Sequence, residues 1–261
     1  MSKPWEVVAV RYGSLQSRKS ELIYRYDSYG EPDETIEMAY YFWLLRRDGE
    51  TVVVDTGFDP IVGARRRRTC LSPPVDALRS LDVDPEQVET VLITHFHYDH
   101  VGNIAAFPRA MFIVPRKEFD FWTSSVASRF QFASHVERDE VARLEQLASE
   151  GRVQLTDAAE EVVDGVRATC VGGHSPGQQV ISVATREGTV ALASDAVHFY
   201  EELERERPFG VIADLAEMYA AYDLLNELAD AGAAVVPGHD PDVLRRYPAL
   251  EGSEGNAVRL G

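Results

Sequence analysis

The segment THFHYDHVGN at residues 94–103 places three histidines and one aspartate within six positions. The whole chain contains only seven histidines, so this segment concentrates a rare residue. Crowded imidazoles repel one another when they are protonated, so the arrangement favours a partner that binds neutral imidazole. Neutral imidazole and carboxylate are both good ligands of Zn²⁺. The segment therefore predicts a metal site, provided that other parts of the chain supply further ligands.

Three more potential ligands lie beside apolar stretches. His174 lies in the turn-rich segment GGHSPGQQ, Asp195 follows the run ALAS, and His239 follows AAVVPG. A single histidine at a strand end is usually a structural residue, and a single aspartate before a turn is usually a cap. The repetition of the pattern favours one shared metal site over several unrelated structural roles.

The elements that must position these residues are mostly strands. Residues 36–57 indicate two apolar strands joined by a turn at Asp48-Gly49. Two further strands are expected in QVETVLIT, which leads into the histidine segment, and in RAMFIV. Hairpins are expected across residues 160–196, and a short strand in AAVVPGHD. Amphipathic patterns predict helices over residues 74–82, 115–124, 135–151 and 214–232.

This order of hairpins, strand–helix pairs, hairpins and a final helix and strand predicts an α/β fold of the αββα type. In such a fold two mixed sheets pack face to face, with helices outside. The sequence contains no low-complexity linker. Residues 1–261 are therefore expected to form a single domain.

The charge balance limits the range of partners. The net charge of −17, from 43 acidic and 26 basic residues, disfavours nucleic acid. The run Arg65–Arg68 is the exception and is typical of a solvated loop. No stretch approaches the roughly 20 apolar residues of a membrane span, and the N-terminus lacks the apolar core of a signal peptide. With two isolated cysteines, Cys70 and Cys170, a cytoplasmic protein is expected.

The order of the motifs resembles that of the metallo-β-lactamase superfamily: HxHxDH at residues 95–100, then a histidine, an aspartate and a final histidine. Within it, the chain is most similar to the N-acyl homoserine lactonases. That likeness rests on the GHSPG turn, on Asp195-Ala196 and on Pro208-Phe209. It implies a quorum-quenching hydrolase that opens the ring of an N-acyl homoserine lactone or a related lactone.

The resemblance also implies a set of metal ligands. Two divalent ions would be held by seven side chains: His95, His97 and His174 on the first, Asp99, His100 and His239 on the second, and Asp195 between them. Zinc is the first candidate, and iron, manganese and cobalt suit the same ligands. Asp55 in VDTG would orient a ligand histidine by hydrogen bonding. A role for Asp55 as a strand-end cap stays equally open.

The implied mechanism is attack on the lactone carbonyl by a hydroxide that the two metals share. Asp99 would carry a proton to the departing ring oxygen. The lactonases have a tyrosine three residues after the bridging aspartate, where this chain has His198. Either His198 or Tyr200 could donate a hydrogen bond to the substrate, and a packing role for His198 stays open.

The substrate pocket and the rival functions are less defined. Aromatic segments at residues 21–30 and 118–132 could form lids over an acyl group, pack under loops or, near the N-terminus, form a homodimer interface. His135 is interpreted as structural.

The alternative function is hydrolysis of another ester or thioester, as in glyoxalase II. A di-iron redox protein and a non-catalytic binding module rank lower, because nothing indicates a flavin module and all seven ligands are present.

Overall fold

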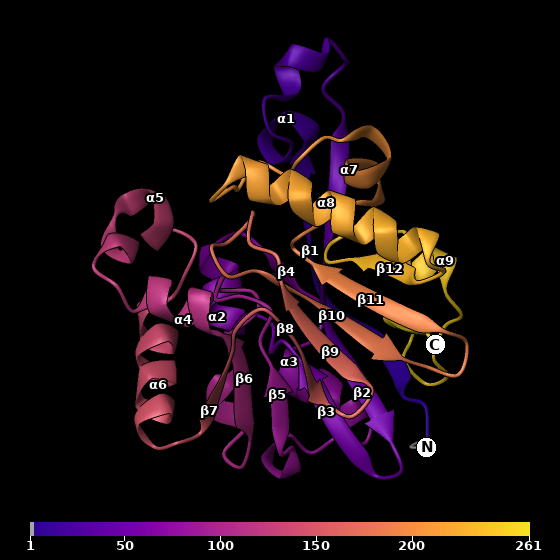
Figure 1. The fold of residues 1–261 in the computed structure, drawn as a ribbon. Helices are drawn as coiled ribbons and strands as arrows, with labels where there is room; N and C mark the ends of the chain where they lie inside the picture. Colours follow the sequence, from indigo (N-terminus) through magenta and orange to yellow (C-terminus); the bar gives the residue numbers. More distant parts are fainter. Residues whose placement is uncertain (1–2) are drawn as a thin grey trace.

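The computed structural model describes residues 3–261, so the first two residues of the expected 1–261 domain lie outside the described residues. Its strands form two sheets (Figure 1). The first sheet has the order β13 (Ala257–Arg259), β1 (Glu6–Arg18), β2 (Thr35–Arg47), β3 (Glu50–Val54), β5 (Thr90–Leu92), β6 (Met111–Pro115) and β7 (Val153–Thr156), with β4 (Thr69–Cys70) paired to β1. The second has the order β12 (Ala234–Pro237), β11 (Thr189–Ser194), β10 (Gln179–Ala184), β9 (Val166–Cys170) and β8 (Ala159–Val163).

Both sheets are mixed, as expected. The first is antiparallel from β13 to β3 and parallel from β3 to β7. The second is antiparallel except for the parallel pair β11–β12.

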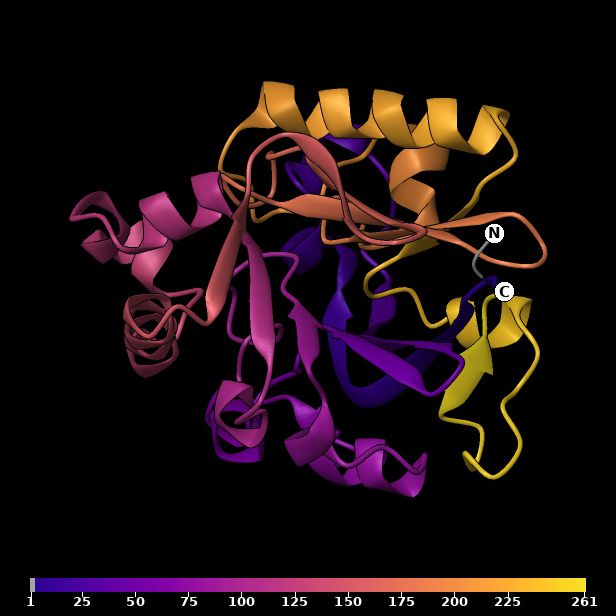
Figure 2. The ribbon, with the colours of Figure 1, turned by 60° about the horizontal axis from the view of Figure 1, so that its bottom comes forward.

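The helices lie on the outer faces of the two sheets (Figure 2). Their bounds are α1 (Lys19–Leu22), α2 (Pro60–Arg65), α3 (Pro74–Ser80), α4 (Arg116–Trp122), α5 (Phe130–Ala133), α6 (Arg138–Ser149), α7 (Tyr200–Arg205), α8 (Leu215–Asp230) and α9 (Val243–Arg246). Helix α8 packs on β11 and β12, while α3 packs on β1 and α6 on β7. This arrangement confirms the predicted αββα sandwich. Among residues 3–261, no helix has the length and apolar character needed to cross a bilayer.

Strand β2 is apolar along almost its whole length because both of its faces are covered. Tyr41 and Trp43 belong to the core that also contains Ile181 and Leu192 of the second sheet. Tyr40 and Phe42 point the other way, into the core that contains α3 and α6 residues. Successive side chains of a strand alternate between its two faces, so the uninterrupted run MAYYFWLL fills both cores.

Local sequence signals explain most of the element boundaries. Asp48 and Gly49 both adopt positive φ, at 50° and 85°, and close the predicted hairpin of β2 and β3. Helix α8 begins after Asp214, whose carboxylate accepts hydrogen bonds from the backbone amides of Ala216 (2.8 Å) and Glu217 (2.9 Å). The long strand β1 was not expected from the sequence. It pairs with β2 along most of its length.

Candidate metal centre

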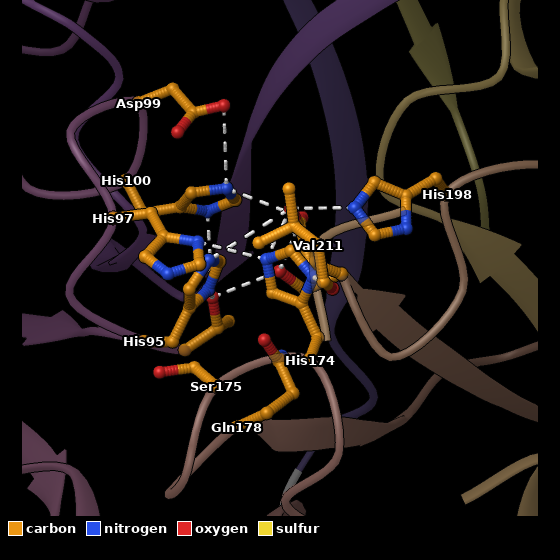
Figure 3. Close-up of polar contacts among 12 residues, drawn as sticks. His95, His97, Asp99, His100, His174, Ser175, Gln178, His198 and Val211 are labelled. Atoms are coloured by element: carbon orange, nitrogen blue, oxygen red, sulfur yellow. Dashed lines mark hydrogen bonds and ion pairs between the residues drawn. The ribbon is translucent and has the colours of Figure 1, made fainter. Parts of the chain in front are cut away.

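The predicted ligands come together where strands of both sheets end. The histidine segment follows β5, Asp195 follows β11 and His239 follows β12, while His174 lies in the loop between β9 and β10. All seven predicted ligand side chains are buried: His95, His97, Asp99, His100, His174, Asp195 and His239. Figure 3 shows imidazoles from these separate segments facing a common centre. The site therefore lies between the two sheets and depends on both.

Two groups of ligands lie on either side of the Asp195 carboxylate. In the first, the Nε2 atoms of His95 and His174 lie 3.8 and 3.3 Å from Asp195 Oδ2. In the second, the Nε2 atoms of His100 and His239 lie 3.2 and 3.1 Å from Asp195 Oδ1. Oδ2 of Asp195 thus faces His95 and His174 and Oδ1 faces His100, while His239 Nε2 lies close to both oxygens, at 3.1 and 3.2 Å.

The remaining two ligands complete these groups. His97 Nδ1 lies 2.8 Å from His174 Nε2, and the ligand atoms of His95, His97 and His174 are close enough together to hold one ion. Asp99, His100 and His239 form a second set of this kind. Asp99 Oδ2 lies 3.8 Å from the Nε2 atoms of both His100 and His239.

The chemistry of this cluster fits divalent metal ions. Burial lowers the pKa of His95, His97 and His174 well below the ordinary value, which favours the neutral form that ligates metals. The Nε2 atoms of His95 and His100 are buried without a hydrogen bond. Buried polar atoms are nearly always satisfied, so two unsatisfied imidazole nitrogens in one cluster are what a bound cation would explain.

A second layer of contacts fixes the orientation of the ligand rings. Asp55 Oδ2 lies 2.7 Å from His100 Nδ1, and Asp55 also accepts hydrogen bonds from the amide and hydroxyl of Thr94, both at 2.8 Å. The Nδ1 atoms of His174 and His239 lie 2.9 and 2.7 Å from the carbonyl oxygens of Val211 and Ala39. These contacts leave the Nε2 atoms directed at the centre.

The backbone is strained beside the site. Asp55 has φ of 61° and Ser194 has φ of 47°, a region that residues other than glycine seldom adopt. Asp55 follows β3 and Ser194 is the last residue of β11, and both strands end at the site. The Thr94 hydroxyl lies 2.9 Å from that of Ser194 and 2.8 Å from Asp55 Oδ2, so Thr94 links the two strained residues.

Glu118 on α4 is a functional residue that sequence reasoning missed. Its fully buried carboxylate accepts hydrogen bonds from Trp122 Nε1 (2.6 Å), Ser175 Oγ (2.5 Å) and the amides of Phe96 (2.9 Å) and Gly177 (2.6 Å). Phe96 lies between the predicted ligands His95 and His97, and Ser175 follows the predicted ligand His174. A Cβ at Gly177 would lie 2.2 Å from the Glu118 amide nitrogen, so the loop requires glycine there. Glu118 therefore ties the two histidine loops together.

His198 approaches the cluster from the opposite side (Figure 3). Its Nε2 lies 3.1 Å from Asp195 Oδ2, and its ring stacks on Phe209 with centroids 3.7 Å apart. Glu202, which sequence reasoning also missed, accepts hydrogen bonds from the amide of His198 (3.0 Å). Burial lowers the pKa of His198, but the carboxylates of Asp195 and Glu202 outweigh burial and raise the pKa to about 9.

Tyr200 does not reach the site. Its ring lies under the guanidinium of Arg246, 3.5 Å from centroid to Cζ, and it does not line the cavity over the cluster. Tyr200 begins α7, whose first turn directs its side chain away from His198 toward the core between the sheets. The structure thus brings only His198 of this pair into position to contact a substrate.

A cavity of about 370 Å³ opens over the cluster. Leu22, Met38 and Phe209 supply apolar lining, whereas the tyrosines at positions 24, 26 and 29, for which a lid was one of the open roles, do not line it. His135, interpreted as structural, does line it, and its ring centroid lies 5.3 Å from that of His97. All seven histidines of the chain therefore lie at or beside the site.

The expectation of a solvated loop at Arg65–Arg68 is wrong in part. Arg65 ends helix α2 and is exposed, as is Arg67. Arg66 and Arg68 are half-buried and line the cavity. The four-arginine run gave no indication of this division, because it follows from the turn after α2, where Arg67 adopts φ of 60°.

Comparisons with known proteins agree with this geometry. A family model described as the metallo-beta-lactamase superfamily matches residues 37–239. The chain is 28% identical over 187 residues to the N-acyl homoserine lactonase AttM of Azorhizobium caulinodans, which covers 69% of this chain and 68% of the relative. The crystal structure of a quorum-quenching N-acyl homoserine lactone lactonase is similar with a TM-score of 0.79 at 22% identity, covering 96% of this chain and 98% of the other. A second similar structure is an N-acyl homoserine lactone hydrolase solved with the product N-hexanoyl-L-homoserine bound at its catalytic metal centre. Its TM-score is 0.78 at 20% identity, covering 95% of this chain and 98% of the other.

Proposed function

The chain belongs to the metallo-β-lactamase superfamily, and from that premise we propose that it is a metal-dependent hydrolase that opens lactone rings. An N-acyl homoserine lactone is the first candidate substrate, because the relatives found by sequence are lactonases for that compound. The observation that carries the proposal is the Asp195 carboxylate, which lies in contact with both histidine groups beneath an open cavity. We infer that residues 1–261 act as one domain, since both sheets contribute to this site.

The proposed ligands are the seven buried side chains already described. His95, His97 and His174 would hold one divalent ion, Asp99, His100 and His239 a second, and Asp195 would contact both. Zinc is the first candidate for both ions, given the imidazole-rich ligand set. When bound, the ions supply a water of lowered pKa and positive charge for the carbonyl oxygen.

The protein's own residues would orient the substrate and move a proton. Asp99 lines the cavity, and the carboxylate oxygen that does not hold the ion would accept a proton from the attacking water and return it to the departing ring oxygen. His198 Nε2 points at the reaction centre and would donate a hydrogen bond to the substrate carbonyl oxygen. Asp55 would hold the ring of His100 in place.

A panel of substrates tests this proposal. The metal-loaded protein is incubated with N-acyl homoserine lactones of short and long chain, thioesters and aryl esters, and proton release is followed. We expect the lactones to be opened fastest, and Asp99→Ala to reduce kcat by about 10²- to 10⁴-fold. Rapid thioester hydrolysis without lactone opening would reassign the enzyme to the glyoxalase-type thioesterases.

A further inference from the structure

One cation in the cavity forms no close ion pair. The half-buried guanidinium of Arg68 donates from Nε to the hydroxyl of Tyr98 (2.9 Å) and from Nη1 to the carbonyl oxygen of Arg66 (2.9 Å). Among residues 3–261, its Nη2 has no hydrogen-bond acceptor and Arg68 makes no direct ion pair, although the more distant charge of Asp99 helps to raise the Arg68 pKa. Its outer edge is therefore available to a ligand.

The neighbouring Arg66, which lines the same cavity, does form an ion pair with a carboxylate. Its Nη2 lies 2.8 Å from Glu137 Oε1, and its Nη1 donates to the carbonyl oxygen of Ser134 (2.8 Å). The chain carries 43 acidic residues against 26 basic ones, so carboxylate partners are abundant. A half-buried guanidinium that forms no ion pair keeps N–H donors for an anionic ligand, and such a ligand would add charge-assisted hydrogen bonds.

Arg68 lies at the proposed substrate cavity. It lines the same cavity as Asp99 and His198. The Tyr98 hydroxyl that accepts its Nε hydrogen bond belongs to the residue between two proposed ligands, His97 and Asp99. Tyr98 is itself buried, and its hydroxyl lies 3.4 Å from that of Tyr40. The guanidinium is thus held rigidly beside the site.

We propose that Arg68 binds a carboxylate of the substrate, so that the enzyme prefers lactones whose acyl group ends in a carboxylate. This inference rests on the proposed lactonase function and specifies its substrate class. The protein occupies Nε and one hydrogen of Nη1, so the substrate carboxylate would bind across the Nη1–Nη2 edge. Paired hydrogen bonds of this kind, between two charged groups, are among the strongest in proteins.

Two substrates of nearly equal shape test the proposal. N-glutaryl homoserine lactone ends in a carboxylate, and its terminal amide is neutral. With the metal-loaded enzyme we expect kcat/KM to be about 10- to 100-fold higher for the acid, as a charge-assisted hydrogen bond predicts. Arg68→Gln should bring the ratio of the two substrates close to one, and Arg68→Lys should restore part of it.

Arg67→Gln is the matched control, because it removes the same charge from an exposed neighbouring residue outside the cavity. It should leave the ratio unchanged. Equal kcat/KM for acid and amide in the unmodified enzyme, or an unchanged ratio in Arg68→Gln, would overturn the proposal while lactone opening itself stands.

A binding measurement separates this proposal from the lactonase function. Glutarate binding to the metal-loaded protein is measured by calorimetry, with thermal melts verifying that each variant is folded. We expect Arg68→Gln, but not Arg67→Gln, to weaken glutarate binding at least about 10-fold. If no lactone is opened, weaker binding to Arg68→Gln would still support the carboxylate site, and equal binding to both variants would refute it.

Discussion

Replacing Glu118 with glutamine tests whether the Glu118 carboxylate holds together the loops that carry His97 and His174. The carboxylate accepts three hydrogen bonds at Oε1, from Phe96, Trp122 and Ser175, and one at Oε2, from Gly177. A glutamine that keeps its oxygen at the Oε1 position would turn its NH₂ group toward the amide of Gly177. That hydrogen bond is lost, and a buried N–H is left without an acceptor.

The cost follows from these contacts. A hydrogen bond to a charged group contributes about 1.5–3 kcal/mol, and an unsatisfied buried donor costs about 1–3 kcal/mol. Because part of this is relieved by small shifts, we expect Glu118→Gln to lower the free energy of unfolding by about 2–4 kcal/mol. The loops that carry His97 and His174 would also lose their common anchor, so zinc affinity should fall about 10- to 100-fold.

Both quantities can be measured on the same protein. Urea unfolding is followed with excess zinc and with chelator, and zinc affinity is determined by competition with a chromophoric chelator. Glu145→Gln is the control, since it makes the same substitution at an exposed position on α6. A loss of stability below about 0.5 kcal/mol in Glu118→Gln, together with unchanged zinc affinity, would refute the reasoning.

Three other predictions concern single groups. In the lactone-opening assay, His198→Phe should lower kcat about 10- to 100-fold at unchanged zinc content, while His198→Tyr retains more activity. Loss of zinc from either variant would instead indicate that His198 is a metal ligand. Burial raises the pKa of Glu140 to about 7, above its ordinary value, so the stability that its protonated form provides is present at low pH and lost as the pH rises through 7. The free energy of unfolding of Glu140→Gln should therefore exceed that of the unmodified protein by about 1–2 kcal/mol at pH 8 and equal it at pH 4. Identical thermal melts of the two proteins at pH 8 would contradict this. Chelation should lower the Tm by an amount that grows with zinc affinity, whereas a Tm unaffected by chelator would argue against a metal at the site.

The clustering of the proposed ligands could be predicted because most of them stand at strand ends in short recurring motifs. His95, Asp195 and His239 each lie near the end of an apolar run, and the ends of neighbouring strands meet at one edge of a sheet. The two cores were predictable for a similar reason, since MAYYFWLL is too apolar for a strand with one exposed face. These features depend on local sequence.

Glu118, Glu202 and Arg68 could not be predicted in this way. Glu118 follows Arg116 and Lys117 in a short helix, where a charged residue is usually exposed, and its partners Phe96 and Gly177 are distant in sequence. Arg68 differs from Arg67 only in the direction set by one turn. The role of each residue depends on which segments the fold brings against it, and such long-range neighbours leave no periodic signal.

The contact of Asp195 with both histidine groups has a consequence for how the protein gains and loses its metals. Ions held there would cross-link segments far apart in the sequence, from the loop after β5 to the end of β12, and so remove entropy from any partly unfolded chain. Since the ligands come from both sheets, they would assemble only after the sheets have docked, and metal uptake would be among the last steps of folding. Release would require ligands from both layers to give up the ion. The exchange of metal with the surroundings would then depend on local opening of these ligand segments as well as on affinity.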